Sequence, residues 1–257
     1  MKTRLVSVGV ASLFMILLPG RATAEVMRWE IDGDTREAIV YAPPGSQEGK
    51  QVPLVLVFHG RGDNMQNFQH INVHRVWSEA IVAYFQGLQV RGGLAGWQVE
   101  RNNGVNRDLK LVDVALASLR STYNIDDDRI YATGYSNGGM FTYLLWAERP
   151  DVFAAYAPVA GLLRPSVRPT QPRPLFHVAG ARDRQVSFAD QEAAIEVAIE
   201  VNGVSATTTS CGVGCALYGS ADTAAPVMTW IHSGGHVYPR GTSERIVSFF
   251  HDHSRTH

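Results

Sequence analysis

The sequence predicts an α/β fold with a mostly parallel central sheet and helices on both faces. Short apolar runs typical of strands alternate with longer segments in which apolar residues recur at helical spacing. Residues 54–58 are apolar at every position, as expected for a strand buried on both faces of a parallel sheet. Residues 108–123 carry a helix-period apolar stripe at Leu109, Val112, Leu116 and Leu119.

Applied along the whole chain, the same two patterns predict the order of the elements. Strands are expected at 37–41, 54–58, 81–85, 129–133, 154–159, 175–178 and 227–231, and helices at 108–123, 137–148, 188–201 and 243–251. Residues 163–174 contain four prolines and predict a stiff loop, and 206–225 form an excursion rich in Thr, Gly and Ser. Because ligands of parallel sheets bind at the carboxyl ends of the strands, the loops after residues 58, 133, 178 and 231 are the places to search.

The N-terminus has the pattern of a secretory signal peptide over residues 1–24. It begins with Lys2 and Arg4, continues with an apolar run at 5–18 and ends in the small-residue site Ala22-Thr23-Ala24. The alternative is a membrane anchor, but the run is shorter than the roughly 20 residues that a spanning helix needs. We therefore expect cleavage after Ala24, a single catalytic domain at 25–257, export to the periplasm or the extracellular space, and no membrane attachment after cleavage.

The charge balance argues against nucleic acid as a partner. The formal net charge is -1, and removing residues 1–24 takes away Lys2, Arg4 and Arg21 and no acid, which gives -1 - 3 = -4. A chain with a net negative charge is not expected to bind the phosphate backbone of nucleic acid.

Cys211 and Cys215 are the only cysteines. Export would place them where disulfides persist, so we expect them to pair across the short loop between them. A metal site is the alternative, but two thiols with no His nearby in sequence are an incomplete ligand set. No metal is expected.

The sequence Gly134-Tyr135-Ser136-Asn137-Gly138 has the form of a nucleophile elbow. An expected strand ends just before it and an expected helix starts just after it, which is the context that the G-x-S-x-G motif requires. The serine sits in a strained turn so that its hydroxyl projects above the sheet. Ser136 is therefore the candidate nucleophile, and this motif is typical of the α/β-hydrolase fold, which we expect for residues 25–257.

A serine hydroxyl needs an imidazole as base, and the imidazole needs an acid that holds its tautomer. In this fold the chain order is Ser, acid, His. Asp183, in the loop after the expected strand 175–178, is the candidate acid; the alternatives are that it belongs to a solvated charge cluster, or that the acid is Asp190 in the following helix. His236, in a glycine-flanked loop after the last expected strand, is the candidate base, and His232 at the strand end is its rival.

Backbone N–H groups should stabilise the negative charge that develops on a carbonyl oxygen when the serine attacks. The expected donors are the N–H of Asn137, directly after the nucleophile, and the N–H of Arg61 in the loop after residues 54–58. His59 in that loop precedes Ser136 in the chain, and a role in shaping the loop is expected for it rather than catalysis.

Four motifs together resemble those of the polyhydroxybutyrate depolymerase and feruloyl esterase group. They are Phe58-His59-Gly60, the segment 123–131, Gly134-Tyr135-Ser136-Asn137-Gly138-Gly139-Met140 and Gly234-Gly235-His236. The resemblance covers nearly all of 25–257. The chain departs from the usual pattern of the group at 61–63 and at 179–181.

The resemblance implies a secreted serine esterase that needs no cofactor and uses Ser136, Asp183 and His236. Such proteins cleave hydroxyalkanoate polyesters, hydroxycinnamoyl (feruloyl) esters on plant polysaccharides, or acetyl esters, as on xylan. We expect no surface-binding module after residues 243–251, and therefore small-molecule or oligomeric esters as substrates, with polysaccharide-linked esters among them. Trp97 is expected either to line the acyl pocket or to lie in the core.

Two other functions remain open from the residues alone. A serine peptidase or an acyltransferase would use the same triad, because the pocket sets the leaving group and the acceptor. A non-catalytic binding protein would require a lost triad member, and all three are present in the sequence.

Overall fold

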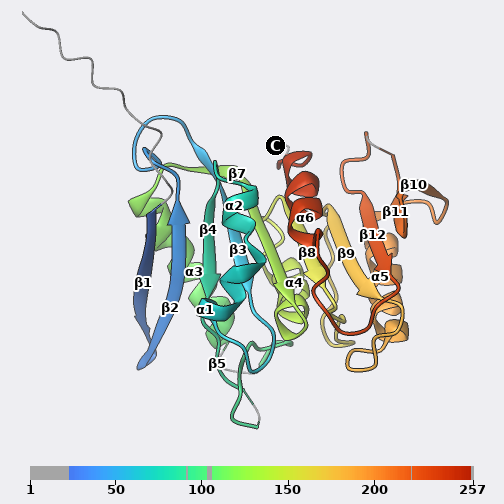
Figure 1. Cartoon of the computed structure of the whole chain (residues 1–257), viewed down its shortest axis with the longest axis horizontal. Coiled ribbons are helices and arrows are strands. Elements are labelled where there is room, and N and C mark those ends of the chain that lie inside the picture. The colour runs from blue at the N-terminus through green and yellow to red at the C-terminus, as the bar shows by residue number, and fades with distance from the viewer. Residues whose placement is uncertain (1–22, 91, 103–105, 221, 256–257) are drawn as a thin grey trace, which may run out of the picture.

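The computed structural model describes residues 23–90, 92–102, 106–220 and 222–255 (Figure 1). Of the expected signal peptide, residues 1–22 lie outside the described residues. Thr23 and Ala24 form the start of strand β1, where they pair with Ala42 and Tyr41 of β2.

A ten-stranded sheet runs through the described part of the chain in the order β1-β2-β4-β3-β7-β8-β9-β12-β11-β10. The strands from β4 to β12 in this order are parallel, and antiparallel strands form both edges. The bounds are β1 Thr23–Ile31, β2 Asp34–Ala42, β3 Val52–Phe58, β4 Ile81–Phe85, β7 Ile125–Tyr135, β8 Ala155–Val159, β9 Leu175–Gly180, β10 Thr208–Gly212, β11 Cys215–Tyr218 and β12 Val227–His232; β5 Leu88–Gln89 and β6 Ala95–Gly96 pair separately.

Helices cover both faces of the sheet, as Figure 1 shows. On one face lie α3 Arg107–Thr122, α4 Asn137–Glu148 and α5 Phe188–Asn202, which share a core cluster with side chains such as Leu54 and Leu56. On the other face lie α1 Met65–Phe68, α2 Val73–Val76 and α6 Thr242–His251, which share a second cluster with Val55 and Val57. A short 3-10 turn, η1, spans Gln69–Ile71. The alternation along β3 arises because successive strand residues point to opposite faces. The predicted three-layer α/β architecture is therefore confirmed.

The segment expected as an excursion at 206–225 contains the hairpin β10–β11, which the sequence did not predict. All five residues of β10 are exposed, so its sequence shows no apolar alternation. The hairpin extends the sheet through β11, which pairs with β12. The predicted disulfide between Cys211 and Cys215 is present, with an S–S distance of 2.01 Å.

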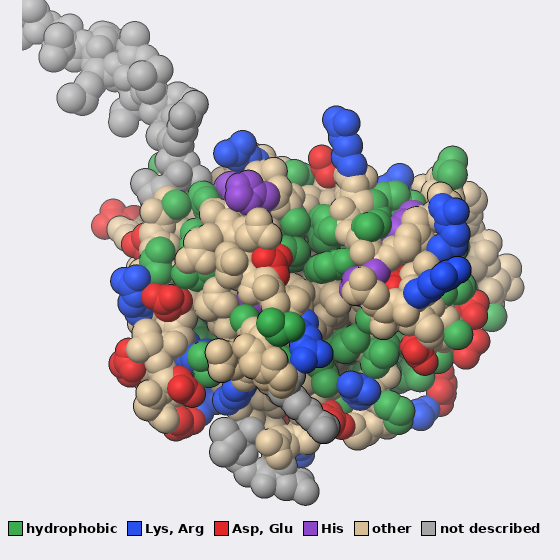
Figure 2. Space-filling view, turned by 60° about the horizontal axis from the view of Figure 1, so that its bottom comes forward, with side chains coloured by type: hydrophobic (Ala, Val, Ile, Leu, Met, Phe, Trp, Pro, Cys, Tyr) green, Lys and Arg blue, Asp and Glu red, His purple; other side chains and the backbone are tan. Residues whose placement is uncertain are grey.

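The loops at the carboxyl ends of the parallel strands share one edge of the sheet. Figure 2 looks toward this edge, where hydrophobic side chains line a hollow between raised lobes that carry charged groups. None of the helices in the described ranges is both long enough and apolar enough to cross a bilayer.

Candidate active site

Ser136 occupies a sharp turn between β7 and α4. Its backbone lies at φ 54° and ψ -113°, a region that L-residues rarely adopt and that costs free energy unless the surroundings hold it. The Ser136 N–H donates to the Val159 carbonyl at 2.8 Å, which ties the turn to β8. The strained turn places the Ser136 side chain in a cavity at the end of the sheet.

The glycines around Ser136 allow helix α4 to approach the sheet closely. A Cβ on Gly138 would lie 2.1 Å from the carbonyl oxygen of Phe58, and one on Gly134 would lie 2.4 Å from the carbonyl oxygen of Gly138. Real Cβ atoms do not come this near to backbone oxygens, so both positions require glycine. The G-x-S-x-G spacing is thus a packing requirement of this turn.

The side chains of Ser136, His236 and Asp183 form a continuous hydrogen-bonded row. His236 Nε2 lies 2.8 Å from Ser136 Oγ, and His236 Nδ1 lies 2.7 Å from Asp183 Oδ2. A carboxylate only accepts hydrogen bonds, so Nδ1 carries the proton and Nε2 presents its lone pair to the serine hydroxyl. The Asp183 side chain is fully buried and that of His236 is 9% exposed, so water competes little with these contacts.

Asp183 is held by four hydrogen bonds rather than solvated with its arginine neighbours. Its Oδ1 accepts from the backbone N–H groups of Gln185 and Val186 at 2.9 and 3.1 Å, and its Oδ2 accepts from Gln191 Nε2 at 3.0 Å as well as from His236. Asp190, the alternative acid, instead bonds to Ser187 at the start of α5.

Behind Asp183 lies a buried polar chain that the sequence did not reveal. Gln191 Oε1 lies 3.3 Å from His177 Nε2, and His177 Nδ1 lies 2.7 Å from the hydroxyl of Tyr143. Because the Gln191 amide oxygen can only accept, Nε2 of His177 donates and Nδ1 accepts from Tyr143. Burial lowers the pKa of His177 to about 4, so its ring is neutral. The sequence feature that could have indicated this chain is the single histidine within the otherwise apolar run 175–178.

The loop that carries His236 is anchored to the loop that carries Asp183. The backbone N–H of Arg182 donates to Gly234 at 2.9 Å, and the Tyr135 hydroxyl donates to the His236 carbonyl at 3.0 Å. His232, the rival base, uses Nδ1 to accept the Gly234 N–H, and burial lowers its pKa. The structure thus gives His232 a role in shaping the loop that presents His236.

Asn137 and Arg61 line the same cavity as Ser136, a space of about 740 Å³. Asn137 is the first residue of α4, where backbone N–H groups have no partner within the helix. His59 precedes Gly60, which lines this cavity, and is fully buried. Its Nε2 accepts the Gly87 N–H at 3.0 Å, so its Nδ1 donates to the Gly60 carbonyl. Burial lowers the pKa of His59, and the two hydrogen bonds of its ring fix the loop that contains Arg61.

Trp97 is a core residue, and the expectation that it lines the acyl pocket is wrong. Its side chain is 1% exposed, packs against Phe58 and Phe141, and donates its indole N–H to the His59 carbonyl at 2.8 Å. The backbone N–H of Trp97 also donates to Oδ1 of the Asn137 side chain at 2.6 Å, and Nδ2 of that side chain donates to the Trp97 carbonyl at 3.1 Å. Trp97 therefore supports the two segments that carry the expected N–H donors without touching the cavity.

The cavity around Ser136 offers an apolar wall beside its polar groups. Leu94, Val99, Met140 and Val186 line it together with Arg164 and Gln185. This mixture suits an acyl group with an apolar body and a polar end. Within the described residues, no group of three or more His, Cys, Asp or Glu side chains could hold a metal ion.

Several curated proteins and solved structures are similar to this chain, and three of the curated proteins are described first. A bifunctional acetylxylan esterase/xylanase of Neocallimastix patriciarum is 33% identical over 62% of this chain and 23% of its own length, and feruloyl esterase B of Piromyces equi is 28% identical over 60% and 30%. Poly(3-hydroxyalkanoate) depolymerase C of Paucimonas lemoignei is 43% identical over 17% of this chain and 11% of its own length. The chain thus spans less than a third of the curated relatives named here.

A family model and a fold match point to the same architecture. Residues 96–171, which include the turn at Ser136, match the prolyl oligopeptidase family. The acetyl xylan esterase from Aspergillus awamori superposes with a TM-score of 0.68 over 89% of this chain and 99% of its own, at 15% identity. The chain therefore has the α/β-hydrolase fold, and in sequence it is similar to esterases of the feruloyl, acetylxylan and polyhydroxyalkanoate types.

Proposed function

We propose that this chain is a serine carboxylic-ester hydrolase that works through an acyl-enzyme. The observation that carries the proposal is the row Ser136 Oγ to His236 Nε2 at 2.8 Å and His236 Nδ1 to Asp183 Oδ2 at 2.7 Å. In the first half-reaction, His236 takes the hydroxyl proton as Ser136 Oγ attacks the ester carbonyl, and then gives this proton to the departing alcohol. Water repeats the sequence on the acyl-enzyme, releases the acid and restores Ser136.

The backbone N–H groups of Asn137 and Arg61 are the proposed donors to the oxyanion. Their positions on the wall of the Ser136 cavity support this role. The hydrogen bonds from the Trp97 backbone N–H to Asn137 Oδ1 and from His59 Nδ1 to the Gly60 carbonyl keep both segments in place before substrate binds. Donors that are already oriented need no reorganisation when the charge develops.

For the substrate, we propose hydroxycinnamoyl (feruloyl) esters, with hydroxyalkanoate esters and acetyl esters on xylan as the alternatives. The names of the similar proteins support these three classes. The apolar wall formed by Leu94, Val99, Met140 and Val186 favours an acyl group larger than acetyl. We also propose export and cleavage after Ala24, since the disulfide suits an oxidising compartment. Cleavage there would shorten β1 by two residues and keep its pairing from Glu25 to Ile31.

A serine peptidase is the second candidate, because residues 96–171 match the prolyl oligopeptidase family. The same triad could attack an amide, and the leaving group distinguishes the two activities. Comparing an ester with the amide of the same acyl group separates them. Faster cleavage of the amide would replace the esterase assignment by the peptidase one.

The test of ester hydrolysis compares the wild type with Ser136→Ala on short p-nitrophenyl esters and methyl ferulate. We expect kcat to fall on the order of 10⁶-fold, because the nucleophile and the base act as a unit. Ser118→Ala, on the half-buried surface of α3, is the matched control and should retain wild-type turnover. Turnover by Ser136→Ala within tenfold of the wild type would contradict the mechanism.

A further inference from the structure

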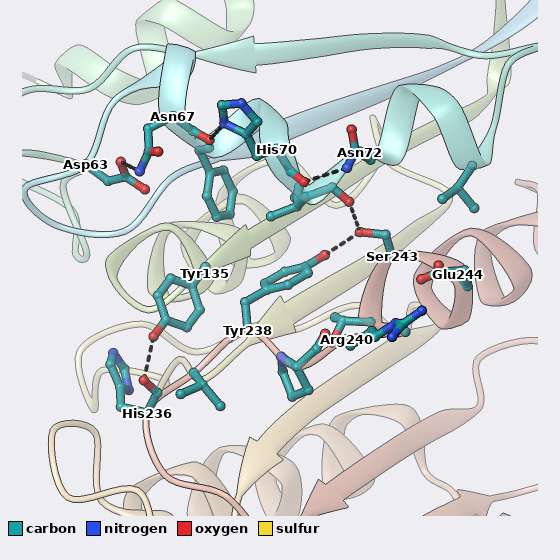
Figure 3. A pocket seen from close by; sticks show the side chains of 17 residues that line it. Asp63, Asn67, His70, Asn72, Tyr135, His236, Tyr238, Arg240, Ser243 and Glu244 are labelled. Carbon is teal, nitrogen blue, oxygen red and sulfur yellow. Dashed lines mark hydrogen bonds between the residues drawn. The ribbon is translucent and has the colours of Figure 1, made fainter.

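A second cavity of about 650 Å³ also borders His236 (Figure 3). The segment 63–76 forms one wall and the segment 236–244 forms the other. Asp63, Tyr135 and His236 line both this cavity and the one that contains Ser136. The two spaces therefore meet along these three side chains, and we call the second one the His236 groove.

The position of His236 decides which part of an ester would enter each space. The acyl carbon must reach Ser136, which lines only the first of the two cavities described above. The departing alcohol must lie beside His236, because this ring returns the proton to the alcohol oxygen. We propose that the His236 groove binds the alcohol part of the ester and that this alcohol is a carbohydrate. This inference rests on the proposed ester hydrolysis.

The groove has an aromatic floor. Phe68 and Tyr238 meet edge to face at 6.0 Å between ring centroids, Tyr135 and Tyr238 do so at 6.2 Å, and Phe68 and Tyr135 stack at 6.4 Å. Aromatic rings offer rigid apolar faces, and the C–H faces of sugar rings pack on such surfaces. This floor suits a flat, weakly polar ring face.

The rim of the groove carries hydrogen-bonding groups of both kinds. Arg240 supplies donors and Glu244 supplies acceptors, and both are exposed (Figure 3). His70 Nδ1 donates to the Asn67 carbonyl at 2.8 Å, so its Nε2 is an acceptor when the ring is neutral. A polyol can bond to both the donors and the acceptors of this rim, because each hydroxyl both donates and accepts a hydrogen bond.

This rim distinguishes a carbohydrate from a polyester. The interior of a hydroxyalkanoate chain has ester oxygens that accept and no hydroxyl that donates, so it offers nothing to the carboxylates of Asp63 and Glu244. A sugar offers hydroxyl donors at every ring. The chemistry of the groove therefore favours polysaccharide-linked esters among the proposed substrate classes.

The groove is held in shape without a ligand. Ser243, which is 3% exposed, donates to the Ile71 carbonyl at 2.6 Å, so the Tyr238 hydroxyl donates to Ser243 at 3.0 Å. This pair of bonds joins the two walls, as Figure 3 shows. On the first wall, the Asn67 amide donates to Asp63 at 2.8 Å. A preformed site loses little free energy to ordering when ligand binds.

The substitution Val76→Trp should narrow the groove. The test measures how fast the variant hydrolyses two esters that share the same acid and differ in the alcohol. Val76 lines the groove and is 36% exposed; Val213, 93% exposed at the tip of the β10–β11 hairpin, provides the matched control Val213→Trp. The substrates are methyl ferulate and the feruloyl ester of a xylo-oligosaccharide, with the two acetyl counterparts run beside them. The readout is the ratio of kcat/KM for the sugar ester to that for the methyl ester.

We expect this ratio to fall about tenfold in Val76→Trp and to stay at the wild-type value in Val213→Trp, since lost pocket contacts typically cost this much. Arg240→Ala removes a hydrogen-bond donor from the rim instead of narrowing the groove, and it should also lower the ratio. Melting temperatures of the three variants check that each is folded. An unchanged ratio in both groove variants, or a wild type that cleaves methyl esters and no sugar ester, would overturn the inference.

Two further outcomes separate this inference from the proposed function. A wild type that cleaves no ester of either acid contradicts the ester hydrolase itself, and the groove inference falls with it. A trimer of 3-hydroxybutyrate serves as the third probe. If Val76→Trp slows hydrolysis of this trimer and spares the sugar ester, the groove binds polyester and the carbohydrate assignment is wrong.

Discussion

Replacing Asp183 by Asn should invert the proton arrangement at His236. Oδ1 of Asp183 accepts two backbone N–H groups, so in the variant the amide oxygen must remain there and the new NH2 group takes the place of Oδ2. That NH2 group would face Gln191 Nε2 and His236 Nδ1, which are both donors in the wild type. His236 then relieves the conflict by carrying its proton on Nε2, where it cannot accept the hydroxyl proton of Ser136.

The wrong tautomer should lower kcat of Asp183→Asn about 10⁴-fold, which corresponds to about 5 kcal/mol in the activation barrier. KM should change only a few-fold, because Asp183 does not line the Ser136 cavity. Losing the bond from Gln191 to a charged acceptor should also lower the free energy of unfolding by about 1.5–3 kcal/mol. Steady-state kinetics on p-nitrophenyl esters and urea unfolding measure the two effects.

Asp190→Asn is the matched control for this experiment. Asp190 is exposed and bonds to Ser187 at the start of α5, so its variant should keep kcat within about twofold of the wild type and lose about 0.3–1 kcal/mol of stability. The reasoning is refuted if Asp183→Asn retains kcat within tenfold of the wild type, or if the two variants lose activity equally.

Two further predictions concern stability. Burial lowers the pKa of His177 to about 4 from the ~6.5 of the unfolded chain, so between these values only the unfolded state binds the proton. The free energy of unfolding should therefore fall by up to about 3 kcal/mol as the pH drops through this window, and His177→Gln should flatten that slope in urea unfolding; equal slopes would contradict the assignment. Replacing Cys211 and Cys215 together by Ser opens a very short loop and should cost at most about 2 kcal/mol, measured as a lower melting temperature; an unchanged melting temperature would exclude a stabilising role.

Signals within a few neighbouring residues made most of the fold predictable. The apolar run at 54–58 indicates a buried parallel strand, and the structure places it as β3 in the middle of the sheet. By contrast, strand β1 and the hairpin β10–β11 lie at the sheet edges. Edge strands bury fewer side chains, so they carry weaker periodicity, and their assignment depends on a partner strand.

Ser136, Asp183 and His236 are singled out by sequence because each follows an expected strand in the order that this fold uses, and the structure brings their side chains within hydrogen-bond distance. Trp97 could not be assigned in the same way, because a tryptophan beside a glycine suits a pocket wall or a core equally. Its burial against Phe58 and Phe141, residues far from it in the chain, decides between them.

By itself, then, the sequence determined the layered α/β architecture, the glycine-framed turn at Ser136 and the cysteine pair, because each depends on neighbours along the chain. Only the tertiary structure decided that Gln191 and His177 support Asp183 from behind, and that a groove with an aromatic floor borders His236. These features join side chains from separate helices, strands and loops. Their hydrogen bonds and ring contacts exist only when the packed sheet brings those elements together.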